Sequence, residues 1–281
     1  MKVNLEENFE VDINNPNIND VKIHSELKES SKHPLTRRPF QEFEFQYINN
    51  PLSEIENCKS VIIIQKPEYF EIVTGFERNI SYNIFGQDSQ GYKYLFKCIE
   101  NTNCILRCIC PTLLRKLDMD FIHITSEQNE SKKMAKSLKP CKCPCFGLCR
   151  PQITLTLNES NEKIGTIIEP FHGCDSFYEI YDDLNNLKYL ISAKCCQCGL
   201  LFSNSIFGGL GEAYFSILDP ESKEQIGNIS KKSPAKYNDL KEFESYKIDF
   251  PENANAKDKL LLVTLGLMID YIYFEIDPSK I

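Results

Sequence analysis

The sequence lacks an apolar run long enough for an ordinary membrane span. Its most hydrophobic stretch, residues 260–274 (LLLVTLGLMIDYIYF), contains Asp270 and would form a helix about 22 Å long, whereas the hydrocarbon core of a bilayer is about 30 Å thick. An acidic side chain in lipid costs about 2.5 to 3.5 kcal/mol on insertion scales. We therefore expect this stretch to be buried inside a large protein core, because its apolar residues occupy every side of the helix. A single-pass membrane anchor over residues 260–276 is the alternative.

Recognisable catalytic motifs are also missing. No nucleophilic triad, phosphate-binding glycine loop or histidine-rich metal motif is present, and the four histidines are scattered. We therefore expect a protein that is not an enzyme. The formal net charge of -8 argues against general attraction to nucleic acid, so no nucleic-acid partner is expected. Residues 1–14 are acidic and have no apolar core of a signal peptide, which favours a cytosolic location.

Cysteine is abundant instead, with thirteen residues, and their clustering is informative. In a chain without a secretory signal, thiols, metal ligands or lipid attachment explain them better than disulfides. Residues 131–150 combine cysteines with basic residues: Cys141, Cys143, Cys145, Cys149, Lys132, Lys133, Lys136, Lys139, Lys142 and Arg150. One acyl chain with a polybasic patch is enough for stable membrane anchoring, so we expect a lipid-anchored segment here. Unmodified thiols in a charged loop, or a zinc knuckle from Cys145 and Cys149, are the alternatives.

Two further cysteine pairs allow a weaker hypothesis. Cys104 and Cys108, together with Cys195 and Cys198, could supply four thiolates to zinc if their loops meet. Buried, inert thiols are the default interpretation of these residues.

The chain divides into a polar N-terminal tail and one large domain. Residues 1–45 are rich in Asn, Glu, Lys and Pro and are typical of a disordered tail, which could bind protein partners. Residues 46–281 form the predicted domain, with short β-type runs at 61–65, 69–75, 92–99, 152–157, 188–193 and 212–218. In residues 152–157, Ile153, Leu155 and Leu157 alternate with Thr154 and Thr156, which predicts one buried face and one exposed face.

A weak internal repeat relates two halves of this domain. Tyr82-Asn83-Ile84, a turn and Lys93-Tyr94-Leu95 are echoed by Tyr178-Glu179-Ile180, another turn and Lys188-Tyr189-Leu190. Many short strands followed by one apolar helix indicate a mainly β protein. We expect a closed β-barrel whose interior is filled by that helix, with these core residues: Leu262, Leu265, Met268, Ile269, Asp270, Ile272 and Phe274.

Five blocks of the sequence resemble those of the phospholipid scramblase family, in the same order and at similar spacing. They are residues 70–77 (FEIVTGFE), Tyr82-x-Ile84 with a turn at Gly91, Cys141-Lys142-Cys143-Pro144-Cys145, Ile248-x-Phe250-Pro251 and residues 269–275 (IDYIYFE). The family has LEVLTGFE, CCCPCC, IxFP and IDFMFFE at the corresponding places. The resemblance covers roughly residues 61–275 and implies a Tubby C-terminal-like barrel of about twelve strands around a hydrophobic C-terminal helix.

The resemblance also implies a function and a calcium segment. Members of the family are expected at membranes, where they move phospholipids in both directions between leaflets, stimulated by calcium and without ATP. The corresponding acidic segment here offers Glu242, Glu244, Asp249 and Asn253. An amide in place of the final bidentate acid should weaken calcium binding, so we expect calcium to be at most a weakly bound cofactor.

The leading hypothesis from the sequence is a scramblase-like protein. It would be lipid-anchored at the cytosolic face of the plasma membrane or an endomembrane, with phospholipids and an anionic membrane surface as partners. The alternative is a non-transporting barrel at the membrane that binds phosphoinositides or partner proteins as a regulator.

Overall fold

The computed structural model describes most of the predicted domain. The chain divides into two units, residues 1–42 and 43–281. All described residues belong to the second unit: 50–65, 80–88, 91–102, 115–124, 131–141, 150–172, 175–197, 212–232 and 245–274. The predicted tail and its boundary at residue 45 therefore lie outside the described residues.

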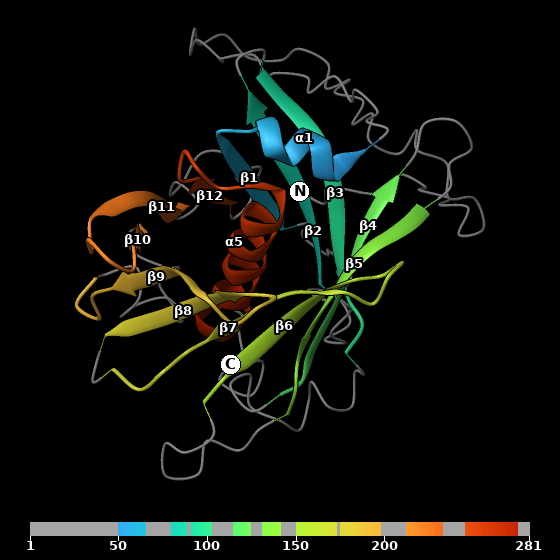
Figure 1. The fold of residues 1–281 in the computed structure, drawn as a ribbon. Helices are drawn as coiled ribbons and strands as arrows, with labels where there is room; N and C mark the ends of the chain where they lie inside the picture. Colours follow the sequence, from blue (N-terminus) through green and yellow to red (C-terminus); the bar gives the residue numbers. More distant parts are fainter. Residues whose placement is uncertain are drawn as a thin grey trace, which may run out of the picture. The chain divides into compact units, whose positions relative to one another are not determined.

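The described elements form a closed antiparallel barrel (Figure 1). Each strand pairs with its neighbours in sequence, and β1 pairs with β12 to close a ring of twelve strands. This confirms the predicted mainly β, twelve-stranded barrel. In chain order the elements are α1 (Pro51–Asn57), β1 (Ser60–Gln65), β2 (Ser81–Asp88), β3 (Gly91–Glu100), β4 (Leu117–Ile124), β5 (Ser131–Lys139), β6 (Gln152–Leu157), β7 (Lys163–Ile168), β8 (Ser176–Asp182), β9 (Leu187–Ala193), β10 (Ala213–Leu218), β11 (Gln225–Lys232), β12 (Ser245–Asp249), α5 (Ala256–Ile269) and the π-helix η3 (Asp270–Phe274).

The strands follow the predicted hydrophobic pattern. In β6, Ile153 and Leu155 are buried whereas Thr154 and Thr156 are partly exposed, as the alternation predicts. The predicted runs at 61–65, 92–99, 152–157, 188–193 and 212–218 coincide with β1, β3, β6, β9 and β10. The run at 69–75 lies outside the described residues. Five of the twelve strands therefore form where the sequence predicts runs of β-branched and aromatic residues.

The internal repeat corresponds to two hairpins on different sides of the ring. The first copy forms β2 and β3, and the second forms β8 and β9, so equivalent strands are six positions apart in the barrel. Tyr82 and Tyr178, which begin the two copies, are both buried. The repeat therefore reflects two similar halves that enclose one core.

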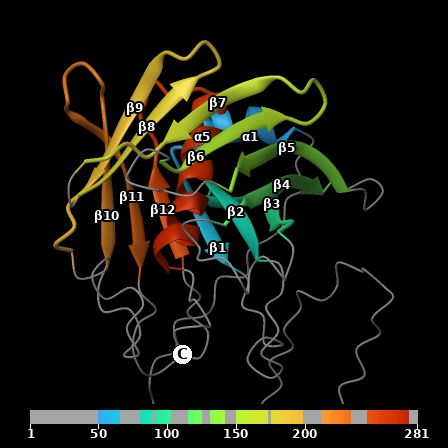
Figure 2. The ribbon, with the colours of Figure 1, turned by 90° about the horizontal axis from the view of Figure 1, so that it is seen from below.

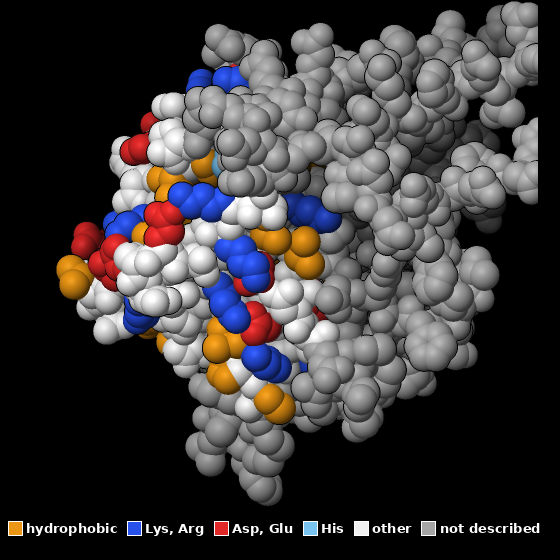
Figure 3. Space-filling model, turned by 90° about the vertical axis from the view of Figure 1, so that its right-hand side faces the viewer, with side chains coloured by type: hydrophobic (Ala, Val, Ile, Leu, Met, Phe, Trp, Pro, Cys, Tyr) orange, Lys and Arg blue, Asp and Glu red, His pale blue; other side chains and the backbone are white. Residues whose placement is uncertain are grey.

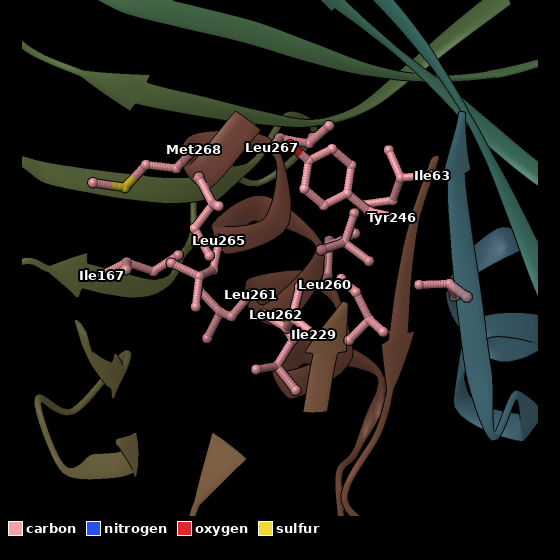
Figure 4. Packing of buried hydrophobic residues seen from close by; sticks show 14 of the residues in the cluster. Ile63, Ile167, Ile229, Tyr246, Leu260, Leu261, Leu262, Leu265, Leu267 and Met268 are labelled. Carbon is pink, nitrogen blue, oxygen red and sulfur yellow. The ribbon is translucent and has the colours of Figure 1, made fainter. Parts of the chain in front are cut away.

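Helix α5 lies inside the ring of strands (Figure 1 and Figure 2). It begins at Ala256 because Asn255 and Asp258 form a reciprocal capping box, with 2.9 Å from Asp258 N to Asn255 Oδ1. Every residue from Asp258 to Ile269 is buried. Leucines on several sides of the helix contact different strands of the barrel (Figure 4). The prediction of a helix that fills the barrel is confirmed, with Ile272 only partly buried and the other predicted core residues buried.

A second helix, α1, was not predicted and packs against the first turns of α5. The residues at its N-terminus are typical of a helix start, because Pro51 occupies the first turn and the Asn50 side chain accepts a hydrogen bond from Leu52 N. Its C-terminal end is bound by a lysine of α5. Buried Lys259 of α5 donates to Glu56 O at 2.6 Å and Cys58 O at 2.9 Å, which satisfies carbonyls at the end of α1.

Two glycines lie where α5 packs closely against the strands of the barrel. We expect substitution by alanine to be costly at one of them and tolerated at the other. A Cβ at Gly165 of β7 would overlap the carbonyl oxygen of Tyr181 and lie 2.8 Å from Leu261 Cδ1. A Cβ at Gly266 of α5 would meet only the flexible ends of Ile63 and Ile248, each at 3.1 Å.

We expect Gly165→Ala to lower the free energy of unfolding by about 1 to 3 kcal/mol, because backbone must move. Gly266→Ala should stay within about 1 kcal/mol of wild type, since a gain in helix propensity offsets the tight contacts. Urea denaturation of both variants measures the difference. Equal losses of unfolding free energy in the two variants would show that the backbone contact at Gly165 does not limit substitution there.

Candidate functional site

The two ends of the barrel differ in the length of their connections. One end carries six long connections: residues 66–80, 101–116, 140–151, 169–175, 194–212 and 233–244. The other end has connections of two to six residues, and α5 enters the barrel there, directly after β12. Consequently η3, which continues α5, ends among the first end's strand termini (Figure 2). We call this end the long-loop end, and it is the candidate functional site.

Asp270, the first residue of η3, is buried in a polar cluster. Its carboxylate accepts hydrogen bonds from Tyr82 Oη of β2 and Tyr246 Oη of β12, both at 2.5 Å. Lys231 Nζ of β11 lies 3.4 Å from Asp270 Oδ1 and 3.8 Å from the centre of the Phe274 ring. Three strands are therefore tied to the helix end through one carboxylate, which compensates for its burial.

Tyr271, the next residue of η3, contacts the residues just before β4. Buried Arg115 donates from Nε to Tyr271 Oη, and its guanidinium carbon lies 4.6 Å from the Tyr271 ring centre. Tyr271 Oη in turn donates to Lys116 O at 3.3 Å. Lys139, at the end of β5, donates from Nζ to Arg115 O at 2.8 Å and is only 1% exposed. A second sector of the barrel is thus connected to η3.

Tyr273 joins the opposite part of the wall. Its hydroxyl lies 2.9 Å from Ser176 Oγ of β8 and 3.5 Å from Glu169 Oε1. Burial raises the pKa of Glu169 above its usual value, although the Arg150 guanidinium opposes this shift. Burial also raises the pKa of Tyr273. We call Asp270, Tyr271 and Tyr273 with these partners the polar layer, which holds the π-helix in register at the long-loop end.

Lys139 predicts a measurable pH dependence. Burial lowers its pKa from 10.5 to about 8, because the ammonium form is disfavoured inside the protein. Between these values the unfolded chain binds more protons than the folded protein, so stability rises with pH there. Relative to Lys139→Met, the wild type should gain about 2 kcal/mol between pH about 7 and pH about 9.5. Urea denaturation at both pH values tests this; exposed Lys132→Met is the control and should leave the gain intact.

The predicted lipid-anchor cysteines belong to a connection at the long-loop end. Cys141 is exposed, whereas Cys143, Cys145 and Cys149 lie outside the described residues. Arg150, which follows them, donates to Glu169 O at 3.1 Å and to Pro170 O at 3.2 Å. Its guanidinium carbon lies 5.5 Å from the ring centre of Phe171, which is 71% exposed. A cation beside an exposed aromatic ring therefore flanks this connection.

The predicted basic patch is largely paired with acids. Lys132 contacts Glu159, Lys133 contacts Asp120, and Lys136 Nζ lies 3.0 Å from Asp118 Oδ1. Burial opposes ionisation of Asp118, but hydrogen bonds from Lys116 and Lys136 outweigh it and lower the pKa of this carboxyl. Within these ion pairs, four lysines against three acids leave one net positive charge. On the face shown in Figure 3, basic and acidic side chains are likewise interspersed.

The prediction that Lys139 belongs to the membrane-contacting basic patch is wrong. This lysine was expected to contact a membrane surface, but it is buried beneath Arg115 O and cannot do so in this fold. The strand period explains the difference, because alternate residues of β5 face the interior. Lys142 lies outside the described residues.

The predicted calcium ligands are separated by a strand. Glu242 and Glu244 lie outside the described residues, but Ser245, the next residue, pairs with Lys232 at the start of β12. Asp249 ends β12 at the opposite end of the barrel, and exposed Asn253 follows it. Strand β12 thus lies between the two pairs of residues in the sequence, and calcium binding by these four residues stays a prediction.

The described residues contain no group of three or more His, Cys, Asp or Glu suited to a metal ion. For the zinc hypothesis, Cys104, Cys108 and Cys198 lie outside the described residues, and Cys195 is partly exposed. His123 is buried in β4 with Nδ1 3.3 Å from Leu95 O, which agrees with a structural histidine.

Comparison with known proteins assigns the chain to a family. The family model described as Scramblase matches residues 43–276, which include every described strand and α5. The chain belongs to the scramblase family. No solved structure shows a significant match to it.

Several curated scramblases are similar to this scramblase-family chain. Human phospholipid scramblase 1 is 24% identical over 230 residues, which cover 82% of this chain and 67% of the relative. Bovine phospholipid scramblase 2 is 23% identical over 264 residues, covering 88% and 82%. Human phospholipid scramblase 4 is 22% identical over 233 residues, covering 82% and 65%. The chain thus spans about two-thirds of the length of the human relatives 1 and 4. A phospholipid scramblase-like function is therefore supported at the level of the family.

Sequence reasoning identified Asp270 but missed the rest of the polar layer. Arg115, Lys139 and Lys231 carry charges into the barrel end, and no local pattern marks them as partners of η3. Tyr82 was noticed in the repeat and in one family block but not as a partner of Asp270, which lies 188 positions later in the chain. Among the described residues, no helix has both the length and the hydrophobicity to cross a membrane.

Proposed function

We propose that this chain is a membrane-associated scramblase that moves phospholipids between leaflets without ATP. The supporting observation is the match to the scramblase family across the whole barrel. The sequence offers no phosphate-binding glycine loop through which ATP could be used. Lipid movement breaks no covalent bond, so the protein acts as a transporter of lipids rather than as an enzyme.

The long-loop end is the part proposed to face the membrane. The connection with the four candidate acylated cysteines lies there, next to Arg150 and the exposed Phe171 ring. A basic side chain beside an aromatic one suits the boundary between headgroups and acyl chains. The lysines contribute less than their number suggests, because acids pair with them. Acyl chains on Cys141, Cys143, Cys145 and Cys149 are therefore proposed to supply most of the affinity for the cytosolic leaflet.

Cysteine replacement tests this anchor. Changing the four cysteines to alanine should move most of the protein from the membrane fraction to the soluble fraction of expressing cells, because one acyl chain contributes about 0.8 kcal/mol per buried CH₂. The matched control changes Cys195 and Cys196, which are exposed or partly exposed thiols at the same end. Membrane association that survives the fourfold change would overturn the proposed anchor, and loss with the control would show that thiols act indirectly.

A phospholipid would not pass through the interior of a single folded barrel. Helix α5 occupies the interior, and its residues from Asp258 to Ile269 are buried against the wall. A phospholipid headgroup would therefore travel along the outer face, at an assembly of several copies, or after the barrel has opened. The mechanism differs in this respect from transport through a pore.

Purified protein in liposomes tests the transport itself. A fluorescent phospholipid in both leaflets is quenched from outside by a membrane-impermeant reductant, in buffer without ATP and with either calcium or a chelator. Loss of more than the outer-leaflet signal supports lipid movement, and its dependence on calcium tests the calcium stimulation that the family resemblance implies. Quenching that stops at the outer leaflet in both buffers would sink the proposal, provided that the protein floats with the liposomes.

The filled interior favours a second candidate function. A barrel occupied by its own helix can serve as a rigid binding domain, and it would then bind phosphoinositides or partner proteins without moving lipids. Liposome flotation with and without phosphoinositide distinguishes the two candidates when combined with the quenching assay. Binding that requires the phosphoinositide, without inner-leaflet quenching, supports the regulator.

A further inference from the structure

Two neighbouring cysteines at the long-loop end bring their sulfur atoms together. Cys195 and Cys196 follow β9, and their Sγ atoms are 3.7 Å apart. Cys195 is partly exposed and Cys196 is exposed. Successive side chains of an extended strand point to opposite faces, so the turn at this position is what makes the two thiols converge. An accessible dithiol results.

The turn is held from both sides. Cys195 N donates to Asp175 Oδ1 at 3.1 Å, which ties it to the residue before β8. On the other side, Gln197 Nε2 donates to Tyr214 O at 2.8 Å, and Tyr214 N donates to Gln197 Oε1 at 2.7 Å. These three bonds fix the backbone on each side of Cys196. The sulfur pair is therefore positioned by β8 and β10 as well as by its own strand.

The distance between the sulfur atoms suits a bridging metal ion. Two thiolates at about 2.3 Å from a tetrahedral ion lie about 3.8 Å from one another. A disulfide needs a separation of about 2.05 Å and normally joins Cα atoms 4.4 to 6.8 Å apart, whereas adjacent Cα atoms are about 3.8 Å apart. A bond between these neighbours would be strained, so chelation fits the pair better than a disulfide.

We propose that Cys195 and Cys196 form a two-thiolate binding site for a soft or borderline metal ion of the Zn²⁺ or Cu⁺ class. Each thiol gives up one proton to solvent and forms one sulfur–metal bond, with no transfer of electrons. The described residues contain no group of three or more metal-ligating side chains, so the proposal assigns these two thiolates alone. The proposal does not depend on lipid transport.

Alkylation kinetics test the site in the full-length, reduced protein. Cys198→Ser removes the third cysteine of the tryptic peptide that begins after Lys194 and leaves the pair intact. Iodoacetamide is added with and without Zn²⁺, and mass spectrometry follows the modification of this peptide. We expect Zn²⁺ to slow alkylation of Cys195 and Cys196 together by about tenfold or more, since a coordinated thiolate is no longer free to react.

Single variants separate chelation from other forms of protection. Cys195→Ser should return the alkylation rate of Cys196 in Zn²⁺ to the metal-free rate, because one thiolate binds the ion weakly. Cys141→Ser, at an exposed thiol elsewhere, should leave the protection unchanged. Equal protection of Cys196 in wild type and Cys195→Ser would overturn the proposal. Absence of protection in saturating Zn²⁺, or a loss of two hydrogens from the peptide after removal of reductant, would also overturn it.

Discussion

Replacing Asp270 by Ala is expected to lower the free energy of unfolding by about 3 to 5 kcal/mol, among the largest single effects in this chain. The change removes the acceptor of two tyrosine hydroxyls and the carboxylate that lies 3.4 Å from the buried Lys231 ammonium. Because the three partners belong to β2, β11 and β12, the loss weakens the contact between the helix and three strands. Urea denaturation followed by circular dichroism measures the change.

An exposed ion pair provides the control. Lys247 and Asp249 lie 2.8 Å apart with side chains 38% and 40% exposed, so Asp249→Ala should cost no more than about 1 kcal/mol. The double variant Asp270→Leu with Lys231→Met should recover part of the lost stability, since it replaces both members of the buried ion pair by apolar side chains. A cost of Asp270→Ala as small as that of Asp249→Ala would show that the carboxylate does not hold the helix end.

Replacing Leu265 by Ala is expected to cost about 2 to 5 kcal/mol. Leu265 is completely buried in the middle of α5, and Figure 4 shows it on the side of the helix near Ile167 of β7. The helix is surrounded by strands, which are held to their neighbours by backbone hydrogen bonds and cannot collapse into the space. The cavity should therefore stay open, which places the cost toward the upper part of the range.

The matched control is Leu184→Ala in the turn between β8 and β9. Leu184 is 76% exposed, so its loss should change the free energy of unfolding by no more than about 0.5 kcal/mol. Both variants are measured by urea denaturation under the same conditions. If Leu265→Ala cost no more than Leu184→Ala, the helix would not be part of the cooperative core in solution.

The barrel and its helix could be predicted because their signals are local. Alternation in β6 and the all-round hydrophobicity of residues 260–269 each follow from a few consecutive residues. The polar layer could not be predicted in the same way. Asp270 was recognisable as too costly to leave in lipid, but its partners Tyr82 and Lys231 come from distant strands. Their pairing depends on the closure of the ring.

The basic patch and the acidic segment show the same limit. Lysines of residues 131–139 were interpreted as free charges, yet Asp118, Asp120 and Glu159 on neighbouring elements pair with them. The acidic segment was interpreted as a single ion-binding loop, but its middle forms β12. In both cases the sequence identifies the charged residues, but only the fold determines which of them lie close together.

The order of the elements has a consequence for synthesis in the cell. Strand β1 is translated early, but its partner β12 and the filling helix follow all the other strands. Until they emerge from the ribosome, the nascent chain presents an unpaired strand edge and an unoccupied apolar interior, both of which favour aggregation. The ring can therefore close only after β12 and α5 have been synthesised, and newly made chains should depend on chaperones that shield them until that last segment packs inside.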